Sequence, residues 1–298
     1  MQIAGVFPAL VTPFDHTGAV SLLAIEHNLR LYNETAVAGF VVLGSTGESV
    51  LLSREEADSV LVAVKDAAAP EKVLIAGTGA ESTAETIART KRAAALGYKI
   101  ALVKTPYYYK PVYKADTFLR HYRAVADASP IPVLLYSVPQ FTGVALETPE
   151  ILALSEHPNI LGIKDSSGVI QRVAEVVAGA HANFHVLTGG AAVIYPALAV
   201  GARGAILALA SALPEKCAQV YEFFQAGEHD RARELQLKLA QISKAIVSES
   251  GIAGVKFVMD LRGYRGGLPR PPLLPLGDEK RHQITAIISA LHPAAASV

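Results

Sequence analysis

A lysine near the end of a predicted strand is the residue of this chain best suited to covalent chemistry. Lys164 follows an apolar run that begins at Ile160, and Asp165 comes directly after it. Because strand side chains alternate between two faces, Lys164 shares a face with Gly162. An ammonium group on the inner face of a closed sheet is costly to desolvate, which favours the neutral, nucleophilic amine. The alternative is a lysine beyond the strand end that pairs with Asp165 in solvent.

Tyrosines and hydroxyl residues stand at the ends of other predicted strands. Tyr136 lies towards the end of one strand, and three consecutive tyrosines, residues 107–109, end another. Ser45 and Thr46 form part of a Gly-Ser-Thr-Gly-Glu turn whose hydroxyls and backbone N–H groups could hold a carboxylate. Each feature has a structural alternative, since tyrosines also serve packing and interfaces and the turn could be a plain connection.

A lysine together with a tyrosine is what imine chemistry requires. The amine attacks a ketone, and the phenol shuttles protons to the carbinolamine and to or from the substrate hydroxyl. A metal-dependent aldolase would instead need a His, Asp or Glu cluster at the same place, and none of the nine histidines falls there. No GxGxxG follows the first strand, so dinucleotide binding is not favoured. We therefore expect no metal and no cofactor, only a covalent imine on Lys164.

Short β-rich runs alternate with longer, alanine-rich helical runs eight times along the chain. The strands are expected at residues 6–14, 39–44, 73–79, 100–106, 131–139, 160–166, 184–190 and 204–211. The alternation implies a parallel sheet, and eight units favour a closed (β/α)8 TIM barrel over an open doubly wound sheet. Active sites of such barrels lie at the C-terminal ends of the strands. The lysine, the tyrosines and the hydroxyl residues all fall at that end.

The predicted organisation is one α/β barrel with an appendage. Residues 1–226 form the barrel, and residues 227–298 form a C-terminal helical extension packed on it. The extension is expected to hold helices at residues 228–247, 254–261 and 278–291. With 51% hydrophobic and 18% charged residues, the 298-residue chain can bury a sizeable core.

Charge and cysteine content exclude several classes of function. Lysine plus arginine equals aspartate plus glutamate at 27 each, so no net charge favours nucleic acid or an anionic membrane. The single cysteine, Cys217, fits a reducing compartment. The first ten residues lack the pattern of a signal peptide, and no apolar run reaches the ~18 residues of a membrane span. We expect a soluble, cytoplasmic protein without nucleic acid or membrane partners.

Four motifs, in this order and spacing, resemble the dihydrodipicolinate synthase / N-acetylneuraminate lyase family of pyruvate-dependent class I aldolases. The resemblance extends over nearly the whole chain. The motifs are Gly44-Ser45-Thr46-Gly47-Glu48, Thr105-Pro106-Tyr107-Tyr108, Tyr136-Ser137-Val138-Pro139 with Thr142-Gly143, and Gly162-Ile163-Lys164-Asp165-Ser166. Members of the family are typically homotetramers, dimers of tight dimers, which implies the same assembly here.

The resemblance implies a role for each matching residue. Lys164 would form the Schiff base with pyruvate or another 2-oxo acid, and Tyr136 would be the proton-shuttling phenol. Thr46 would relay protons, and Tyr108 would complete that relay across a subunit interface. The residues implied to hold or line the substrate are Ser45, Thr46, Ser166, Gly189, Ile206 and Phe141.

Phe141 bears on the choice of substrate. The synthase branch carries an arginine at this position for the carboxylate of its aldehyde substrate, and phenylalanine removes that charge-assisted contact. Several segments, including residues 251–256, look like the 4-hydroxy-2-oxoglutarate aldolase branch instead. We therefore expect cleavage of 4-hydroxy-2-oxoglutarate to pyruvate and glyoxylate. The alternatives are a dihydrodipicolinate synthase acting on aspartate semialdehyde, another 2-oxo acid aldolase or hydratase-aldolase, and a non-catalytic barrel that binds a 2-oxo acid.

Overall fold

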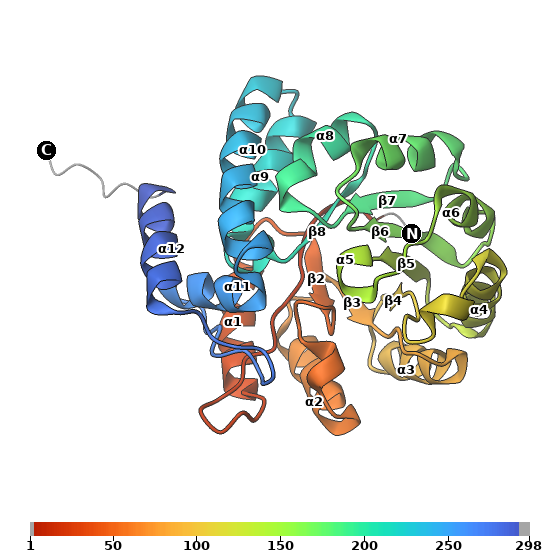
Figure 1. The fold of residues 1–298 in the computed structure, drawn as a ribbon, viewed down its shortest axis with the longest axis horizontal. Coiled ribbons are helices and arrows are strands. Elements are labelled where there is room, and N and C mark those ends of the chain that lie inside the picture. The colour runs from red at the N-terminus through yellow and green to blue at the C-terminus, as the bar shows by residue number, and fades with distance from the viewer. Residues whose placement is uncertain (1–2, 292–298) are drawn as a thin grey trace, which may run out of the picture.

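Eight parallel strands form a barrel, and the helices that connect them cover its outside (Figure 1). The structure is a computed structural model, and it describes residues 3–291. The strands are β1 (Gly5–Pro8), β2 (Gly39–Val42), β3 (Val73–Gly77), β4 (Ile100–Lys104), β5 (Val133–Ser137), β6 (Ile160–Asp165), β7 (His185–Thr188) and β8 (Gly204–Leu207). The predicted fold class, a (β/α)8 TIM barrel followed by C-terminal helices, is confirmed.

The barrel closes between its first two strands. The ladder runs from β1 through β8, β7 and so on to β2. Backbone hydrogen bonds then join the two ends, from Ala38 N to Val6 O and from Leu10 N to Val41 O, each 2.9 Å long. Closure leaves no free sheet edge and gathers all strand C-termini at one mouth.

A helix follows every strand, although the connection after β5 contains two. The helices are α1 (Leu22–Asn33), α2 (Arg54–Ala67), α3 (Thr83–Ala95), α4 (Ala115–Ala128), α5 (Pro139–Thr142), α6 (Thr148–Ser155), α7 (Ile170–Gly179), α8 (Ile194–Ala199) and α9 (Pro214–Gln225). The start of α2 shows how local sequence fixes where a helix begins. Ser53 Oγ accepts from Glu56 N at 3.2 Å, and Ser53 N donates to the Glu56 carboxylate at 2.9 Å. This reciprocal capping box satisfies two N–H groups that the helix itself cannot.

Most predicted strands extend too far at the mouth. The first was expected at residues 6–14 but β1 ends at Pro8, and the fifth was expected to reach Pro139, which instead begins α5. Proline suits the first helical turn because its missing N–H has no partner there. The residues beyond the strand ends form the loops of the mouth, where sites in this fold lie.

The barrel interior is filled with apolar side chains. Inward-facing residues from neighbouring strands form one buried cluster: Phe7, Val41, Ile75, Ile100, Leu102, Leu134, Leu187 and Ile206. The interior is therefore a packed core and not a pore. Side-chain alternation from this cluster fixes which polar residues at the mouth point inward.

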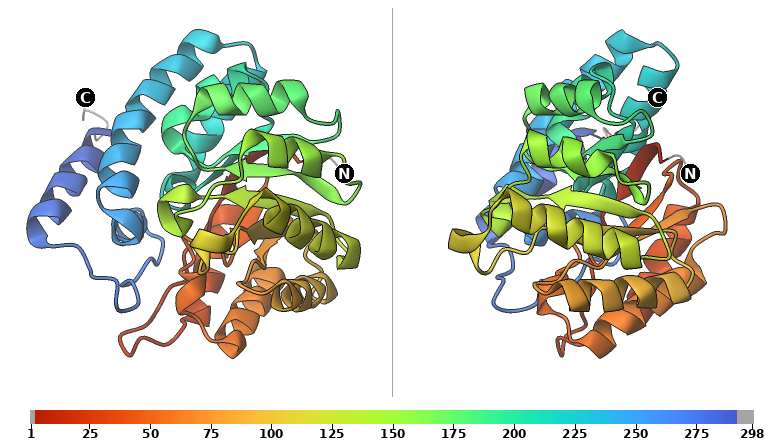
Figure 2. Two further views of the ribbon diagram at one scale, coloured as in Figure 1. Left: turned by 45° about the vertical axis from the view of Figure 1, so that its right-hand side comes forward. Right: turned by 90° about the vertical axis from the view of Figure 1, so that its right-hand side faces the viewer.

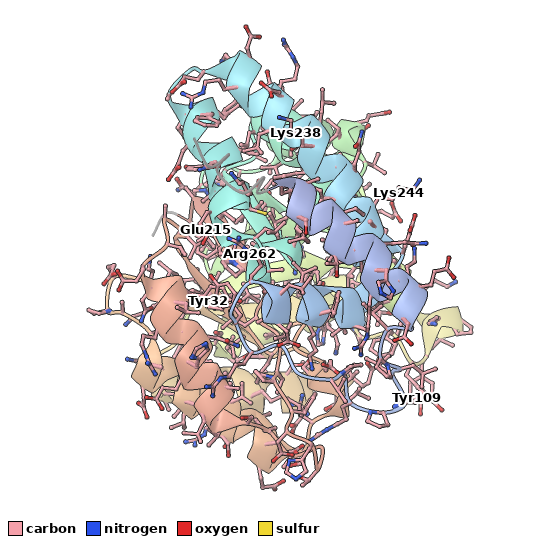
Figure 3. All side chains as sticks on the ribbon, turned by 90° about the vertical axis from the view of Figure 1, so that its left-hand side faces the viewer. Tyr32, Tyr109, Glu215, Lys238, Lys244 and Arg262 are labelled. Carbon is pink, nitrogen blue, oxygen red and sulfur yellow. The ribbon has the colours of Figure 1, made fainter. Side chains whose placement is uncertain are left out.

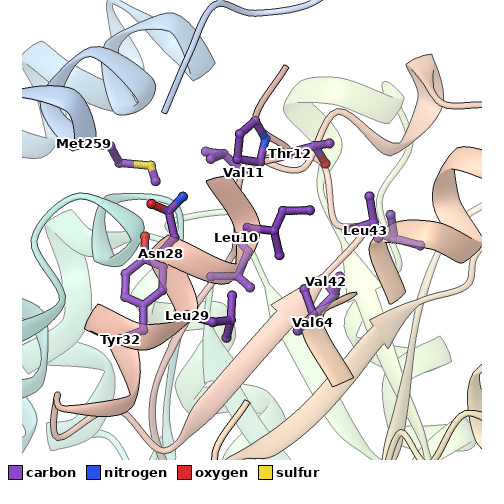
Figure 4. A pocket seen from close by; sticks show the side chains of 13 residues that line it. Leu10, Val11, Thr12, Asn28, Leu29, Tyr32, Val42, Leu43, Val64 and Met259 are labelled. Carbon is purple, nitrogen blue, oxygen red and sulfur yellow. The ribbon is translucent and has the colours of Figure 1, made fainter. Parts of the chain in front are cut away.

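The space between α1, α2 and the barrel is also tightly packed. Figure 4 shows this region, which Leu10, Leu29, Val42 and Val64 line together with Tyr32. The cavity there measures about 10 Å³, which is room for about one water molecule. A space of this size cannot hold a substrate.

The C-terminal helices lie together on one side of the barrel (Figure 2). They are α10 (His229–Ser243), α11 (Gly251–Leu261) and α12 (Asp278–Leu291). The boundary predicted at residue 226 falls in the turn between α9 and α10, and α10 packs along α9. Figure 3 shows this side, where Arg262 after α11 lies near Glu215 of α9, 3.8 Å apart. Residues 292–298 of the predicted extension lie outside the described residues.

Candidate active site

Lys164 and Tyr136 meet on the inner face of the barrel mouth. The β5–β6 register pairs Tyr136 directly with Lys164. The Lys164 Nζ atom lies 4.2 Å from the centroid of the Tyr136 ring, and the two residues are 4% and 5% exposed. A buried amine beside a phenol is the arrangement that imine formation and proton transfer need.

Asp165 is not the partner of Lys164. Its Oδ2 atom lies 2.8 Å from Nε of Arg172 on α7, and its Oδ1 atom accepts from Ser167 N at 2.8 Å. Strand alternation directs Asp165 away from the barrel interior and Lys164 into it. The alternative of a solvent-exposed Lys164–Asp165 ion pair is wrong.

The turn after β2 brings a hydroxyl to Tyr136. Ser45 Oγ lies 3.4 Å from the Tyr136 hydroxyl, and either atom can donate. Thr46 was expected to relay protons, but its hydroxyl makes no hydrogen bond to another residue of the described chain. The hydroxyl contact of the phenol within residues 3–291 comes from Ser45, and the relay role of Thr46 stays a prediction.

Glu48 anchors this turn to the C-terminal extension. Its φ of 54° is in the left-handed region, which is uncommon for a residue with a side chain. Its carboxylate lies 2.6 Å from Nζ of Lys256 on α11, both side chains being fully buried. It also accepts from Arg270 N at 2.8 Å. Burial lowers the pKa of Lys256, and the Glu48 carboxylate opposes that shift.

Lys256 also contacts groups other than the Glu48 carboxylate. Its Nζ atom donates to Thr12 O at 2.8 Å and to Leu268 O at 2.9 Å, and it lies 4.4 Å from the centroid of the Phe14 ring. One side chain therefore joins the loop after β1, the loop after β2 and the segment before α12. The extension supports the geometry of the mouth.

Ser166 and Gly189 lie in contact across β6 and β7. Ser166 N donates to Ser137 O at 3.0 Å, and Gly189 N donates to Asp165 O at 2.6 Å. A Cβ atom at Gly189 would lie only 1.9 Å from Ser166 Oγ. Glycine is therefore required at position 189 as long as Ser166 keeps its place. Ile206 is fully buried inside the barrel.

Tyr108 points outward in the single chain. It is 73% exposed, and its ring meets the ring of Tyr109 edge to face at 5.0 Å. The Glu81 carboxylate accepts from the backbone N–H groups of Tyr107 and Tyr108 at 3.0 and 2.8 Å. The loop is thus fixed while the Tyr108 phenol remains available to another molecule.

A cavity of about 270 Å³ opens at the mouth beside Ser45. Phe141 of α5 lines it and is 67% exposed. Lys104, the last residue of β4, lines the same cavity, and the register pairs it with Tyr136. Burial lowers the pKa of Lys104, while the Glu81 carboxylate opposes the shift.

A model of the dihydrodipicolinate synthetase family matches residues 2–291. The chain belongs to this family. A 4-hydroxy-tetrahydrodipicolinate synthase from Exiguobacterium is 38% identical over 275 residues, which cover 92% of this chain and 93% of the relative. One from Methanothrix thermoacetophila is 35% identical over 288 residues, covering 96% of each chain.

Solved structures of the family agree with the fold. A dihydrodipicolinate synthase from Bacillus anthracis superposes with a TM-score of 0.93 at 29% identity, covering 97% of this chain and 99% of that one. The Acinetobacter baumannii enzyme, crystallised with pyruvate, gives a TM-score of 0.91 at 32% identity, covering 97% and 98%. The chain is therefore a lyase of the pyruvate-dependent class I aldolase type.

Membership in the dihydrodipicolinate synthetase family corrects one expectation. The predicted placement in the 4-hydroxy-2-oxoglutarate aldolase branch is not supported, because the relatives just described are named as synthases. That placement gave the greatest weight to one loop residue, Phe141. The identity with the synthases extends over almost the entire chain.

Two lysines near the mouth, Lys104 and Lys256, escaped the sequence analysis. Lys104 could have been found, because Ile100 and Leu102 point inward and alternation then directs residue 104 inward too. Lys256 also carried a signal, as a lone lysine in an otherwise apolar stretch of α11. Within residues 3–291 no group of three or more His, Cys, Asp or Glu side chains could hold a metal ion. No helix in the same range is long and apolar enough to cross a membrane.

Proposed function

We propose that the chain is a 4-hydroxy-tetrahydrodipicolinate synthase, which condenses pyruvate with aspartate semialdehyde. The observation that carries the proposal is the buried Lys164 amine, 4.2 Å from the Tyr136 ring on the inner face of the mouth. Relatives of that name, 35% and 38% identical over nearly the full length, support the choice of reaction. The pyruvate complex of the Acinetobacter baumannii enzyme supports the choice of first substrate.

The first half of the reaction takes place on Lys164. Its Nζ atom attacks the C2 carbonyl carbon of pyruvate, and the Tyr136 hydroxyl protonates the oxygen that leaves as water. The resulting imine withdraws electrons from the neighbouring methyl group, which then loses a proton to give an enamine. Ser45, 3.4 Å from the phenol, is the hydroxyl placed to pass that proton on.

The turn after β2 holds the pyruvate carboxylate in this proposal. Ser45 Oγ of this turn lies 3.4 Å from the Tyr136 hydroxyl, and Glu48 keeps the turn in place through Lys256. In the proposal, Ser166 and Gly189, which lie in contact at the ends of β6 and β7, line the pyruvate site together with Ile206 of the barrel core. Fixed donors hold the reacting carbon near the amine without reorganisation during the reaction.

The second half joins the two substrates. The enamine carbon attacks the aldehyde carbon, a new carbon–carbon bond forms, and Tyr136 protonates the alkoxide. The amino group contributed by aspartate semialdehyde then attacks the imine carbon, which closes the ring and releases the Lys164 amine. No redox partner is needed, because the electron pair of the new bond comes from the enamine.

We also propose a homotetramer, a dimer of dimers, in the cytoplasm. Exposed side chains gather on the loop after β4, where Tyr108, Tyr109 and Val112 are 73%, 64% and 67% exposed. A partner chain seated there would cover them and bring the Tyr108 phenol close to a neighbouring site. Cys217, the only cysteine of the sequence, is buried and free, as suits a reducing compartment. Sedimentation of the purified protein as a monomer would contradict this assembly.

Borohydride trapping tests the imine directly. Incubation with pyruvate and borohydride should place one covalent adduct on Lys164, located by peptide mass spectrometry. In Lys164→Met, which keeps a side chain of similar length, both the adduct and turnover should disappear. Full turnover in this variant, or an adduct on another lysine in the wild-type protein, would refute the mechanism.

A second candidate is the retro-aldol cleavage of 4-hydroxy-2-oxoglutarate. The observation that favours it is Phe141, an exposed apolar residue at the mouth where the synthase branch is expected to carry an arginine. A panel of the two reactions separates the candidates, with glyoxylate release and semialdehyde condensation followed independently. Faster glyoxylate release would replace the synthase assignment while leaving the imine mechanism in place.

A further inference from the structure

We propose that Lys104 binds the carboxylate of the second substrate, and so selects acidic aldehydes over neutral ones. The inference rests on the proposed function, which supplies an aldehyde that carries a carboxylate. It assigns the specificity of the site to a lysine at the end of β4.

Lys104 points into the barrel mouth at the level of the catalytic pair. The register pairs Lys104 with Tyr136, and Tyr136 in turn with Lys164. Since neighbouring strands lie about 4.8 Å apart, the three residues form one row across the inner face. Ile100 and Leu102, four and two residues earlier on β4, belong to the interior cluster, so strand alternation directs Lys104 inward as well.

The lysine borders the cavity into which a second substrate can enter. Lys104, Ser45 and Phe141 all line the space of about 270 Å³. Ser45 also lies 3.4 Å from the Tyr136 hydroxyl, so this space adjoins the atoms that would react. Glu48 is another charged group in the lining, but its carboxylate is already paired with Lys256 at 2.6 Å.

The Lys104 ammonium retains donors for a ligand. Its Nζ atom donates to Gly79 O at 2.9 Å and lies 5.3 Å from the centroid of the Tyr107 ring. A lysine ammonium has three N–H donors. Of the charged groups around it, Glu81 favours its charged form and Arg89 disfavours it, while half-burial weakens its hydration. A partly desolvated cation of this kind attracts a carboxylate more strongly than one in water.

Lys72 shows how a purely structural lysine differs. It is also half-buried, and its Nζ atom donates to Thr35 O at 2.7 Å and to Val37 O at 2.9 Å. It stands directly before β3, at the opposite end of the barrel from the mouth. Lys72→Met therefore removes the same charge and the same type of contact without touching the site, and it is the matched control.

The experiment compares, in steady-state kinetics, an aldehyde that carries a carboxylate with one whose carboxylate is esterified. Wild type, Lys104→Met, Lys104→Arg and Lys72→Met are assayed at saturating pyruvate with aspartate semialdehyde and with its methyl ester. Lys104→Met should lower kcat/KM for the acid by roughly 10- to 100-fold, because a hydrogen bond to a charged group is lost. The ester should change by less than about threefold, because it offers no carboxylate to the lysine. Lys104→Arg should recover part of the loss, and Lys72→Met should match wild type.

The outcomes separate this inference from the proposed function. If wild type forms no borohydride-trapped adduct with pyruvate, the proposed function itself fails. If the adduct forms but Lys104→Met lowers the rates for acid and ester equally, or lowers neither, Lys104 does not bind the carboxylate of the second substrate. A rise in the KM of pyruvate alone would assign Lys104 to the first substrate and would also overturn the inference. Lys104→Gln, which keeps a donor for Gly79 O, answers the same question if the methionine variant does not fold.

Discussion

Replacing Lys256 with methionine tests whether the C-terminal extension supports the barrel mouth. The change removes a fully buried ammonium 2.6 Å from Glu48 and leaves that buried carboxylate without its countercharge. It also leaves Thr12 O and Leu268 O without the donor that now lies 2.8 and 2.9 Å away. Breaking a buried ion pair from one side costs about 3–5 kcal/mol. We expect the free energy of unfolding of Lys256→Met to fall by that amount.

A double-mutant cycle identifies the origin of the loss. Glu48→Gln alone should be similarly destabilising, because the Lys256 ammonium then loses its carboxylate. The double variant should be more stable than the sum of the two losses, since neither unpaired charge remains. Urea unfolding measures all four proteins, at one protein concentration so that assembly does not alter the comparison.

Activity provides the second readout. Lys256 does not line the cavity, yet its loss should lower kcat as well as stability, because the Glu48 anchor of the Ser45 turn is weakened. A loss below about 1 kcal/mol in either single variant, or strict additivity in the double, would refute the ion-pair reasoning. If Lys256→Met is destabilised but keeps its kcat, the Glu48–Lys256 pair stabilises the fold without affecting catalysis.

Two further predictions concern other parts of the mouth. Gly189→Ala places a Cβ atom 1.9 Å from Ser166 Oγ, so the serine must move and kcat/KM should fall about 100-fold. Gly277→Ala, whose Cβ meets nothing within 4 Å, is its control, and a loss below twofold in Gly189→Ala would contradict the contact. Hydrogen bonding from Arg270 holds the pKa of Glu56 at about 2, below its ordinary 4.5. The stability gap between wild type and Glu56→Gln should therefore be full above about pH 4.5 and close as the pH falls towards 2, and a gap independent of pH in thermal unfolding would be the contrary result.

The fold was predictable because its signals are local and repeated. Alternation of strands and helices needs no long-range information, and the Ser53–Glu56 capping box could be read from the sequence and is present. The strand ends were less predictable. Apolar residues continue past Val42, but the strand ends there, and Leu43 adopts a φ of 59°. Hydrophobicity alone does not show where a barrel strand stops pairing.

The site was predictable only where strand alternation applies. Lys164 and Tyr136 lie within regular strands, so their shared inner face followed from the period of two. Ser45 and Thr46 lie in a turn, where no fixed period decides which hydroxyl reaches the phenol. The role predicted for Tyr108 needs knowledge of the assembly, because its side chain is exposed in the single chain and could reach a site only in a second molecule.

The comparison of Phe141 with Lys104 shows why residue type at one position does not settle a substrate. A carboxylate needs a cation at a given point in space, and side chains from different strands can reach that point. Phe141 on α5 and Lys104 on β4 line the same cavity, so the charge expected on the loop after β5 can be supplied by the neighbouring strand. A lysine there offers a point charge and not the planar fork of an arginine, so it should bind the carboxylate with less geometric selection. An enzyme built this way should accept acidic aldehydes of more than one length, with aspartate semialdehyde as one of several.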